Sequence, residues 1–142
     1  SIQLINSGSN PPPTQDTNVA LNKTATAAST YSSYYPKNAV DGDINTYWAA
    51  TSRSKRWLAV DLGGNYNISS VKINWNGSSY ATDYRVQTWN GSSWVTQKSV
   101  QGDGDWDEIV FSNTVSTSKV RIYCNTSAGS YYAINELEVY GH

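Results

Sequence analysis

The sequence predicts an all-β fold of the sandwich type. After residue 18 the chain consists of short runs in which apolar and polar residues alternate, which is the period of a half-buried β-strand. Gly, Asn, Ser or Asp bounds each run, and no helical stretch of useful length lies between them. Regularly spaced short strands of this kind are typical of a β-sandwich.

Seven strands are expected, and the alternation justifies each of them in turn. In chain order they are 56–63 (RWLAVDLG), 68–75 (ISSVKINW), 83–90 (DYRVQTWN), 93–100 (SWVTQKSV), 106–112 (WDEIVFS), 118–125 (SKVRIYCN) and 134–141 (INELEVYG). The stretch WNGSSW, with Asn90-Gly91 at its centre, predicts a hairpin turn. The single cysteine, Cys124, lies inside an alternating run and is expected to be a small buried apolar residue.

The composition of the 142-residue chain suits one domain. Ten basic and eleven acidic residues give a net charge of -1, so nucleic acid is not an expected partner. The 11 Tyr and 6 Trp could form a surface for neutral polar ligands, or they could serve as strand formers, and the composition leaves both readings open. No apolar run is long enough to span a membrane, and a membrane is not expected as a partner.

The first residues predict a link to another module. Residues 1–8 (SIQLINSG) are expected to be the tail strand of a preceding module, and the proline-rich residues 9–17 are expected to form a stiff linker. The domain proper would then cover residues 18–142. An edge strand of this same domain remains the alternative for residues 1–8.

The sequence offers no catalytic machinery. The only histidine is His142, the last residue, and hydrolysis of a glycoside needs a pair of carboxylates in a cleft. The acidic cluster of Asp103, Asp105 and Asp107 is expected to be a solvated turn. We therefore expect that the domain is not an enzyme.

Several motifs in a fixed order resemble a known family. They are NVALNKTATAAS, YPKNAVDGDINTYW, RWLAVDLGGNYNISSVKINW, DYRVQTWNGSSWV and KVRIYCNTSAGSYYAINELEVYG. Together they resemble the discoidin, or coagulation factor 5/8 type C, family, and in particular its bacterial family 32 carbohydrate-binding modules, over residues 18–141. The resemblance implies a β-sandwich jelly roll of the galactose-binding-domain type and lectin-like binding without catalysis. It also implies a secreted, bacterial, glycan-active parent enzyme whose other modules are the partners of this one, and we expect a monomer.

The stretch NAVDGDINTYW (38–48) gathers acids in a chain that has few of them. Asp-Gly-Asp is favourable turn chemistry, so a plain turn is one reading. The resemblance implies another, a structural calcium ion held between this loop and the last strand. The ligands it implies are the Asn38 carbonyl, Asp41, Asp43, the Thr46 carbonyl and hydroxyl, the Asn135 carbonyl and the Glu136 carboxylate. Trp48, directly after the loop, is expected to lie in the core.

The resemblance also implies that sugar binds on loops at one end of the sandwich. The loops in question are 29–36, 47–56, 75–83 and 126–132. Their platform candidates for a sugar ring are Tyr34, Tyr80 and Tyr131, and their hydrogen-bonding candidates are Arg53, Asn76 and Asp83, with Tyr31 and Tyr47 as weaker members. A structural role remains an alternative for each, whereas Tyr84 and Tyr123 are expected in the core.

Elimination favours a neutral ligand. Galactose-binding relatives usually carry a His after the loop tryptophan and an Arg near the start of the 75–83 loop, where this chain has Ala49 and Asn76 or Gly77. Chitosan-binding relatives use Glu in these loops, and the three Glu here lie elsewhere. A neutral glucan or another cell-wall polysaccharide is therefore the expected ligand. The alternatives are a galactose- or GalNAc-type lectin module and a phospholipid- or protein-binding discoidin domain.

Overall fold

The computed structural model describes residues 15–54 and 56–142, which form eight strands and one short 3-10 helix. In chain order these are β1 (Thr17–Asn18), β2 (Thr24–Ala27), η1 (Pro36–Val40), β3 (Trp48–Ala49), β4 (Trp57–Trp75), β5 (Ala81–Trp89), β6 (Trp94–Val100), β7 (Trp106–Ser127) and β8 (Ala133–Gly141). The only helix in these ranges has five residues and cannot cross a membrane. The expected tail strand 1–8 and most of the expected linker lie outside the described residues.

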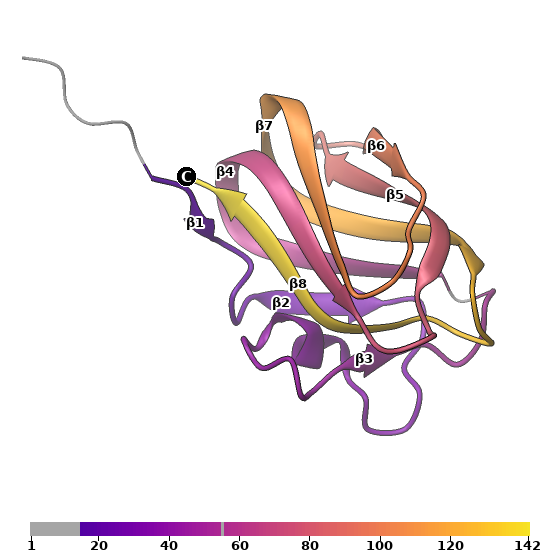
Figure 1. The fold of residues 1–142 in the computed structure, drawn as a ribbon. Coiled ribbons are helices and arrows are strands. Elements are labelled where there is room, and N and C mark those ends of the chain that lie inside the picture. The colour runs from indigo at the N-terminus through magenta and orange to yellow at the C-terminus, as the bar shows by residue number, and fades with distance from the viewer. Residues whose placement is uncertain (1–14, 55) are drawn as a thin grey trace, which may run out of the picture.

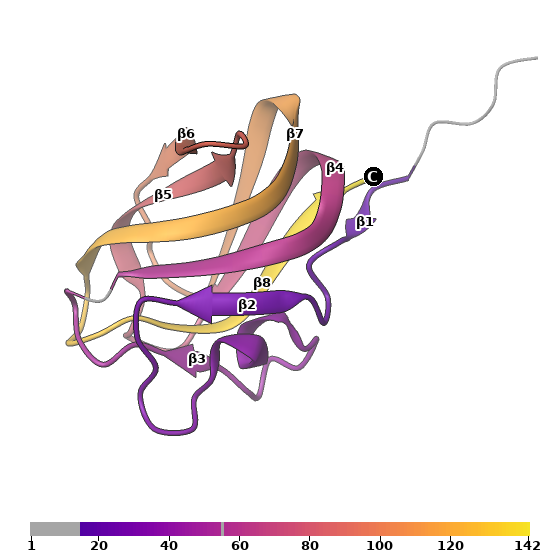
Figure 2. The ribbon, with the colours of Figure 1, turned by 180° about the vertical axis from the view of Figure 1, so that it is seen from behind.

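Two long bent strands, β4 and β7, pass through both layers of the sandwich. Residues 58–61 of β4 pair with β2 on one side, and residues 57–61 pair with residues 119–123 of β7 on the other. After the bend, residues 68–75 of β4 pair with β8, and residues 70–74 pair with the beginning of β7. One layer is thus β2–β4–β7–β5–β6 and the other is β1–β8–β4–β7, as Figures 1 and 2 show from opposite sides. The all-β sandwich prediction is confirmed.

The predicted strand boundaries at these two bends were wrong. The sequence predicted separate strands at 56–63 and 68–75, and at 106–112 and 118–125, but each pair is one continuous strand. The β4 bend contains Gly63 at a φ of +81°, and the carboxylate of Asp61 accepts a hydrogen bond from the Gly63 N–H at 3.0 Å. Turn chemistry therefore bends the strand there without ending its pairing with β7.

The core lies between the two layers and follows the alternation of the strands. Leu58, Val60 and Leu62 face inward from β4, and Trp48 and Tyr84 are fully buried, as predicted. Cys124 is also buried, and its burial raises the pKa of the thiol. Tyr123 departs from the core prediction, because it is half-buried on the outer face of its layer.

The β5–β6 hairpin forms at the predicted turn. Asn90 N–H donates to the Ser93 carbonyl at 3.1 Å, and the Asn90 side-chain oxygen accepts from the N–H groups of Ser92 and Ser93, each at 2.9 Å. Gly91 adopts a φ of +101°, which glycine tolerates without strain.

The two described ends of the chain lie side by side. β1 pairs with the end of β8, Thr17 with Gly141, so the sheet begins at the last residue assigned to the linker. Asp16 accepts a hydrogen bond from the Ser69 hydroxyl and lies 2.8 Å from Nδ1 of His142. Figure 1 shows these ends at the opposite side of the molecule from the long loops around β3.

Candidate functional site

The four loops predicted to carry the sugar site meet at one end of the sandwich. Tyr31 N–H donates to the Ala49 carbonyl at 2.8 Å, which joins the first loop to the second. Ala50 N–H donates to the Tyr132 carbonyl at 2.8 Å, and Ala128 N–H donates to the Tyr80 carbonyl at 3.0 Å. Backbone hydrogen bonds thus connect all four segments, which are far apart in the sequence.

Four tyrosines from three of these loops form one aromatic cluster, the tyrosine cluster. Tyr34 and Tyr47 stack with ring centroids 4.4 Å apart, and Tyr31 lies 6.0 Å from Tyr34. Tyr131 joins through Tyr31, at 6.4 Å. A hydrogen bond with Tyr34, together with desolvation, raises the pKa of Tyr47 to about 12. The Tyr47 phenol therefore stays neutral, and the cluster presents aromatic faces and hydroxyl groups.

The other predicted sugar-binding residues are not part of the tyrosine cluster. The Asn76 side chain donates to the Asn135 side-chain oxygen at 2.9 Å, and Tyr80 packs beside Gly104. Asp83 is half-buried at an irregularity in the pairing of β5 with β7. Arg53 is exposed and lines a hollow together with Arg56 and Tyr132. Arg53 is therefore the predicted hydrogen-bonding residue that lies open at this end.

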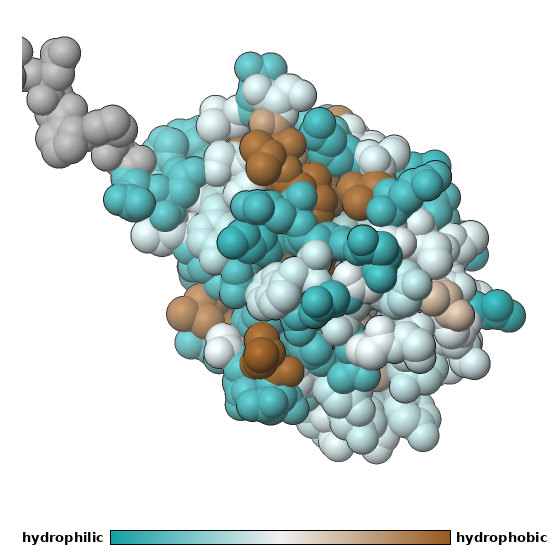
Figure 3. All heavy atoms as spheres, in the orientation of Figure 1, coloured by the Kyte–Doolittle hydropathy of each residue, from teal (hydrophilic) through white to brown (hydrophobic). Residues whose placement is uncertain are grey.

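Figure 3 shows how polarity is distributed over one side of the molecule. The end that carries the long loops is mostly pale, which marks residues of intermediate hydropathy. The strongly hydrophilic residues lie over the sheet and toward the chain ends, and the apolar patches are small and separate. This distribution is what the abundant Tyr, Ser, Ala and Thr of the loops produce.

The loop after η1 gathers the oxygens predicted to bind calcium. The Thr46 hydroxyl lies 2.5 Å from Oδ2 of Asp41, 3.0 Å from the Asp43 carbonyl and 3.3 Å from the Asn38 carbonyl. Gly42 N–H donates to the Glu136 carboxylate at 2.9 Å, which ties the loop to β8. The Asn135 side chain points elsewhere, to Asn74 and Trp75, so only its carbonyl could contribute.

The surroundings of the Glu136 carboxylate indicate whether this loop could hold a cation. Glu136 is only 1% exposed, and its Oε1 is buried without a hydrogen-bond partner among the described residues. Burial raises the pKa of Glu136 to about 7, and the Asp41 carboxylate adds to the rise. No group of three or more His, Cys, Asp or Glu in the described ranges is arranged for a metal. A hard cation also accepts carbonyl and hydroxyl oxygens, however, so this donor set fits calcium.

The acidic cluster before β7 differs from the solvated turn that was predicted. Asp107 lies in β7, where its Oδ2 accepts hydrogen bonds from the Tyr84 hydroxyl at 2.7 Å and from Trp75 Nε1 at 3.0 Å. Burial raises the pKa of Asp107, while these two hydrogen bonds oppose the rise. Asp107 is therefore a structural anchor for two aromatic side chains, whereas Asp103 and Asp105 are exposed.

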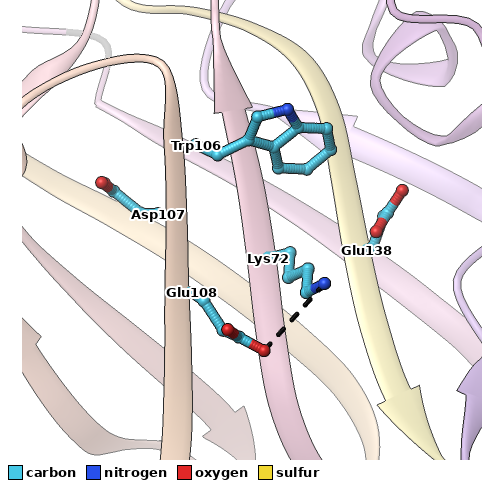
Figure 4. A pocket seen from close by; sticks show the side chains of 5 residues that line it. All are labelled: Lys72, Trp106, Asp107, Glu108 and Glu138. Atoms are coloured by element: carbon cyan, nitrogen blue, oxygen red, sulfur yellow. Dashed lines mark ion pairs between the residues drawn. The ribbon is translucent and has the colours of Figure 1, made fainter.

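A separate hollow lies on the outer face of the β8–β4–β7 layer. Figure 4 shows Trp106, Lys72, Glu108 and Glu138 gathered there, with Asp107 pointing away. Lys72 is opposite both glutamates in the strand register and lies 4.0 Å from the Glu108 carboxylate. We call these four residues the acidic hollow, which the sequence reasoning did not anticipate.

A second feature missed from the sequence lies on the outer face of the other layer. Arg121 is surrounded there by Trp57, Trp94 and Tyr123. The alternation in KVRIY, which puts Lys119, Arg121 and Tyr123 on one face, was the available signal. It shows which side chains share a face but not which strands lie beside them.

Comparisons with known proteins agree with this architecture. The model of the F5/8 type C domain family matches residues 24–137. Chitosan-binding module 1 of a chitosanase/glucanase from Paenibacillus sp. IK-5 is 34% identical, with a TM-score of 0.83 over 88% of this chain and 99% of that one. Module 2 of the same enzyme, solved with chitotriose, is 38% identical, with a TM-score of 0.82 over 87% of this chain and 100% of that one.

A more distant structure shares the fold. The family 32 carbohydrate-binding module of NanJ from C. perfringens, in complex with galactose, is 23% identical, with a TM-score of 0.79 over 89% of this chain and 98% of that one. A search of curated proteins found no match.

Proposed function

Because this chain belongs to the F5/8 type C domain family, we propose that it is a non-catalytic carbohydrate-binding module whose tyrosine cluster binds a neutral polysaccharide. The observation that carries the proposal is the grouping of Tyr31, Tyr34, Tyr47 and Tyr131 at the loop end. A sugar ring presents an apolar C–H face that stacks on an aromatic ring, and its hydroxyl groups need nearby hydrogen-bonding partners. The phenol hydroxyls and Arg53 supply such partners.

The charges at the loop end favour a neutral sugar over a cationic one. Arg53 and Arg56 line the hollow beside the tyrosine loops, and they would repel an amino sugar that carries a positive charge. Glu108 and Glu138 lie on a sheet face, and Glu136 is buried beneath the η1 loop. A neutral glucan or cell-wall polysaccharide is therefore favoured, even though the two Paenibacillus relatives bind chitosan.

In this proposal the domain is one module of a longer, secreted, bacterial enzyme. Both described ends lie away from the loop end, so a neighbouring module could be attached without covering the tyrosine cluster (Figure 1). The domain would then hold its parent enzyme on the polysaccharide while contributing no chemistry. We expect the isolated domain to release no reducing ends from any polysaccharide that it binds.

Calcium would have a structural role in this proposal. Asp41 and Glu136 would supply carboxylate oxygens, Thr46 its hydroxyl and carbonyl, and Asn38, Asp43 and Asn135 further oxygens. The ion would neutralise two neighbouring carboxylates and tie the η1 loop to β8. Trp48, two residues after Thr46, packs in the core and hydrogen-bonds the Ser29 carbonyl at 2.9 Å, so this loop could order the start of the tyrosine region.

A titration followed by amide chemical shifts tests the proposal. Cello- and laminari-oligosaccharides should perturb residues of loops 29–36, 47–56 and 126–132, with a dissociation constant on the order of 10 μM to 1 mM, because one stacked ring offers a small contact area. Chitotriose and galactose serve as the cationic and galactose-type comparators. Tighter binding of either comparator would overturn the neutral-glucan assignment, and perturbations confined to a sheet face would overturn the loop-end site.

A further inference from the structure

The outer face of the β2–β4–β7–β5–β6 layer concentrates aromatic rings and cations. Directly opposite residues in an antiparallel sheet share a face, so the strand register arranges these side chains in rows. One row is Trp57–Tyr123–Arg85, the next is Ala59–Arg121–Gln87, and the third begins with Asp61–Lys119. Trp89 and Trp94 face each other at the far side. We call Trp57, Trp94, Lys119, Arg121 and Tyr123 the arginine face, and Figure 2 shows its strands from β2 at the bottom to β6 at the top.

Arg121 occupies the centre of the arginine face. Its guanidinium carbon lies 4.6 Å from the Trp94 ring centroid, 5.2 Å from Tyr123 and 6.0 Å from Trp57. Its Nε donates to Gln87 Oε1 at 2.8 Å, and Gln87 is its one hydrogen-bonding partner among residues 15–54 and 56–142. The rings therefore hold the guanidinium in place while most of its N–H donors remain available.

The cations of this face lack acidic partners. In the described part of the chain the two ion pairs are Lys72–Glu108 and His142–Asp16, and neither includes Arg121, Lys119 or Arg56. Partial burial lowers the pKa of Arg121, because desolvation penalises its charged form. An arriving anion would offset that penalty. Asp61, opposite Lys119, is the single acid that lines the hollow here.

The two outer faces of the sandwich thus differ in charge. The acidic hollow has two glutamates on either side of Lys72, whereas the arginine face has two cations against Asp61. A net charge of -1 conceals this separation. The cationic side also continues toward the loop end. Trp57 and Arg121 line a hollow with Ser54 and Arg56. Ser54 and Arg56 in turn line the next hollow with Arg53.

We propose that the arginine face is a second carbohydrate-binding surface, for a polysaccharide whose sugars carry carboxylate groups. The guanidinium of Arg121 matches a carboxylate with parallel N–H donors, and Lys119 supplies a second charge on the adjacent row. Trp94 and Trp57 flank Arg121 and can receive the C–H faces of neighbouring sugars. Thr24 and Thr26, which line the same hollow, offer hydroxyl groups. This surface is distinct from the tyrosine cluster, and it does not depend on the neutral-sugar proposal.

The test uses the whole chain, with polygalacturonate as the anionic probe and laminarin as the neutral one. Affinity electrophoresis or calorimetry should detect binding of polygalacturonate to the domain. Arg121→Gln should weaken that binding about fivefold or more, in line with loss of one charge-assisted contact. Lys119→Gln should weaken it less. Lys72→Gln is the matched control, because Lys72 also lies over an aromatic ring, that of Tyr140 at 5.7 Å, but faces acids. It should leave the affinity within about twofold.

The outcomes separate this proposal from the preceding one. Tyr131→Ala should reduce laminarin binding and spare polygalacturonate, whereas Arg121→Gln should do the reverse. Raising the salt concentration should weaken only the binding of polygalacturonate. Absence of polygalacturonate binding, or equal losses in Arg121→Gln and Lys72→Gln, would overturn the proposal. A single-stranded oligonucleotide that binds the arginine face more tightly than polygalacturonate would also overturn it. Unchanged melting temperatures confirm that each variant is folded.

Discussion

The ring of Tyr47 lies face to face with the ring of Tyr34, with the centroids 4.4 Å and the planes 11° apart. The two residues come from different loops, and a backbone hydrogen bond from Ala49 N–H to the Tyr34 carbonyl, at 3.1 Å, fixes their relative position. The stack occupies one face of each ring, and Tyr31 lies nearly parallel to Tyr34 at 6.0 Å. Tyr31 lies between Tyr34 and Tyr131 and, at 54% exposed, is the most exposed member of the cluster.

Removing the ring of Tyr131 should reduce sugar binding without unfolding the domain. Tyr131 is half-buried on a loop, and Tyr131→Ala removes an aromatic contact worth about 1 kcal/mol beyond area burial, which is roughly fivefold in affinity. Tyr131→Phe should retain most of the binding because the ring remains. Calorimetry with a laminari-oligosaccharide measures both variants. Tyr140→Ala, on the outer face of β8, is the control, and an equal loss there would remove the case for the tyrosine cluster.

Calcium should stabilise the fold, and EDTA should reverse the effect. A ligand that binds only the native state raises the free energy of unfolding by roughly 2.7 kcal/mol at a hundredfold excess over its dissociation constant. EDTA should therefore lower the melting temperature by several degrees, measured by scanning calorimetry. Asp41→Asn should abolish this sensitivity, because it removes a carboxylate from the donor set. The exposed Asp103→Asn should keep it, and a melting temperature unaffected by EDTA would contradict the site.

The metal-free domain should become less stable as the pH rises from about 4.5 to about 7. The pKa of Glu136 is raised from 4.5 to about 7 in the folded state, so the folded state binds more protons than the unfolded state in this window. Its contribution to stability is present at low pH and is lost as the pH rises through the folded pKa. Urea unfolding in EDTA at several pH values measures the trend.

A matched variant isolates the contribution of Glu136 to that trend. Glu136→Gln removes the titrating group but leaves Asp107, whose pKa is also raised, in place. The slope of unfolding free energy against pH should flatten in Glu136→Gln relative to the parent chain. Saturating calcium should have a similar effect in the parent, because calcium needs the charged carboxylate. Identical slopes in EDTA for the two chains would show that Glu136 has an ordinary pKa.

Asp107 should matter for stability and not for binding. Asp107→Ala leaves the buried Tyr84 hydroxyl and the Trp75 indole N–H without their acceptor, which should cost about 2 kcal/mol in the free energy of unfolding. Asp107→Asn should cost less, because its amide oxygen can still accept a hydrogen bond. Chemical denaturation measures both, with Asp103→Ala as the exposed control. A loss of unfolding free energy as small as that of the control would mean that the Tyr84 hydroxyl and the Trp75 indole N–H donate to water in the variant.

The local pattern predicted much of the sheet. Alternation identified the inward residues Leu58, Val60 and Leu62, and the turn chemistry of Asn90-Gly91 identified the β5–β6 hairpin. It could not show that β4 continues through Gly63, because the pairing that keeps the strand intact comes from β7, much later in the chain. The burial of Asp107 was missed for the same reason, since its partners Tyr84 and Trp75 lie on other strands.

The candidate site divides in a similar way. The resemblance of the motifs to a known family predicted which loops carry the site, and the structure joins those loops by hydrogen bonds. Which side chains remain open there depends on neighbours that the sequence does not reveal. Asn76 is held by Asn135, whereas Arg53 is exposed.

The sequence by itself determined that this protein is all β, the position of the turn in its β5–β6 hairpin, and the residue types that its loops carry. Alternation and turn chemistry act between neighbours in the chain, so the sequence shows them directly. Only the tertiary structure decided that Tyr34 stacks on Tyr47 and that Arg121 lies among Trp57, Trp94 and Tyr123. Those contacts follow from strand register and layer packing. Both are set by hydrogen bonds and apolar burial between segments distant in the chain, so the alternation within one strand leaves them undefined.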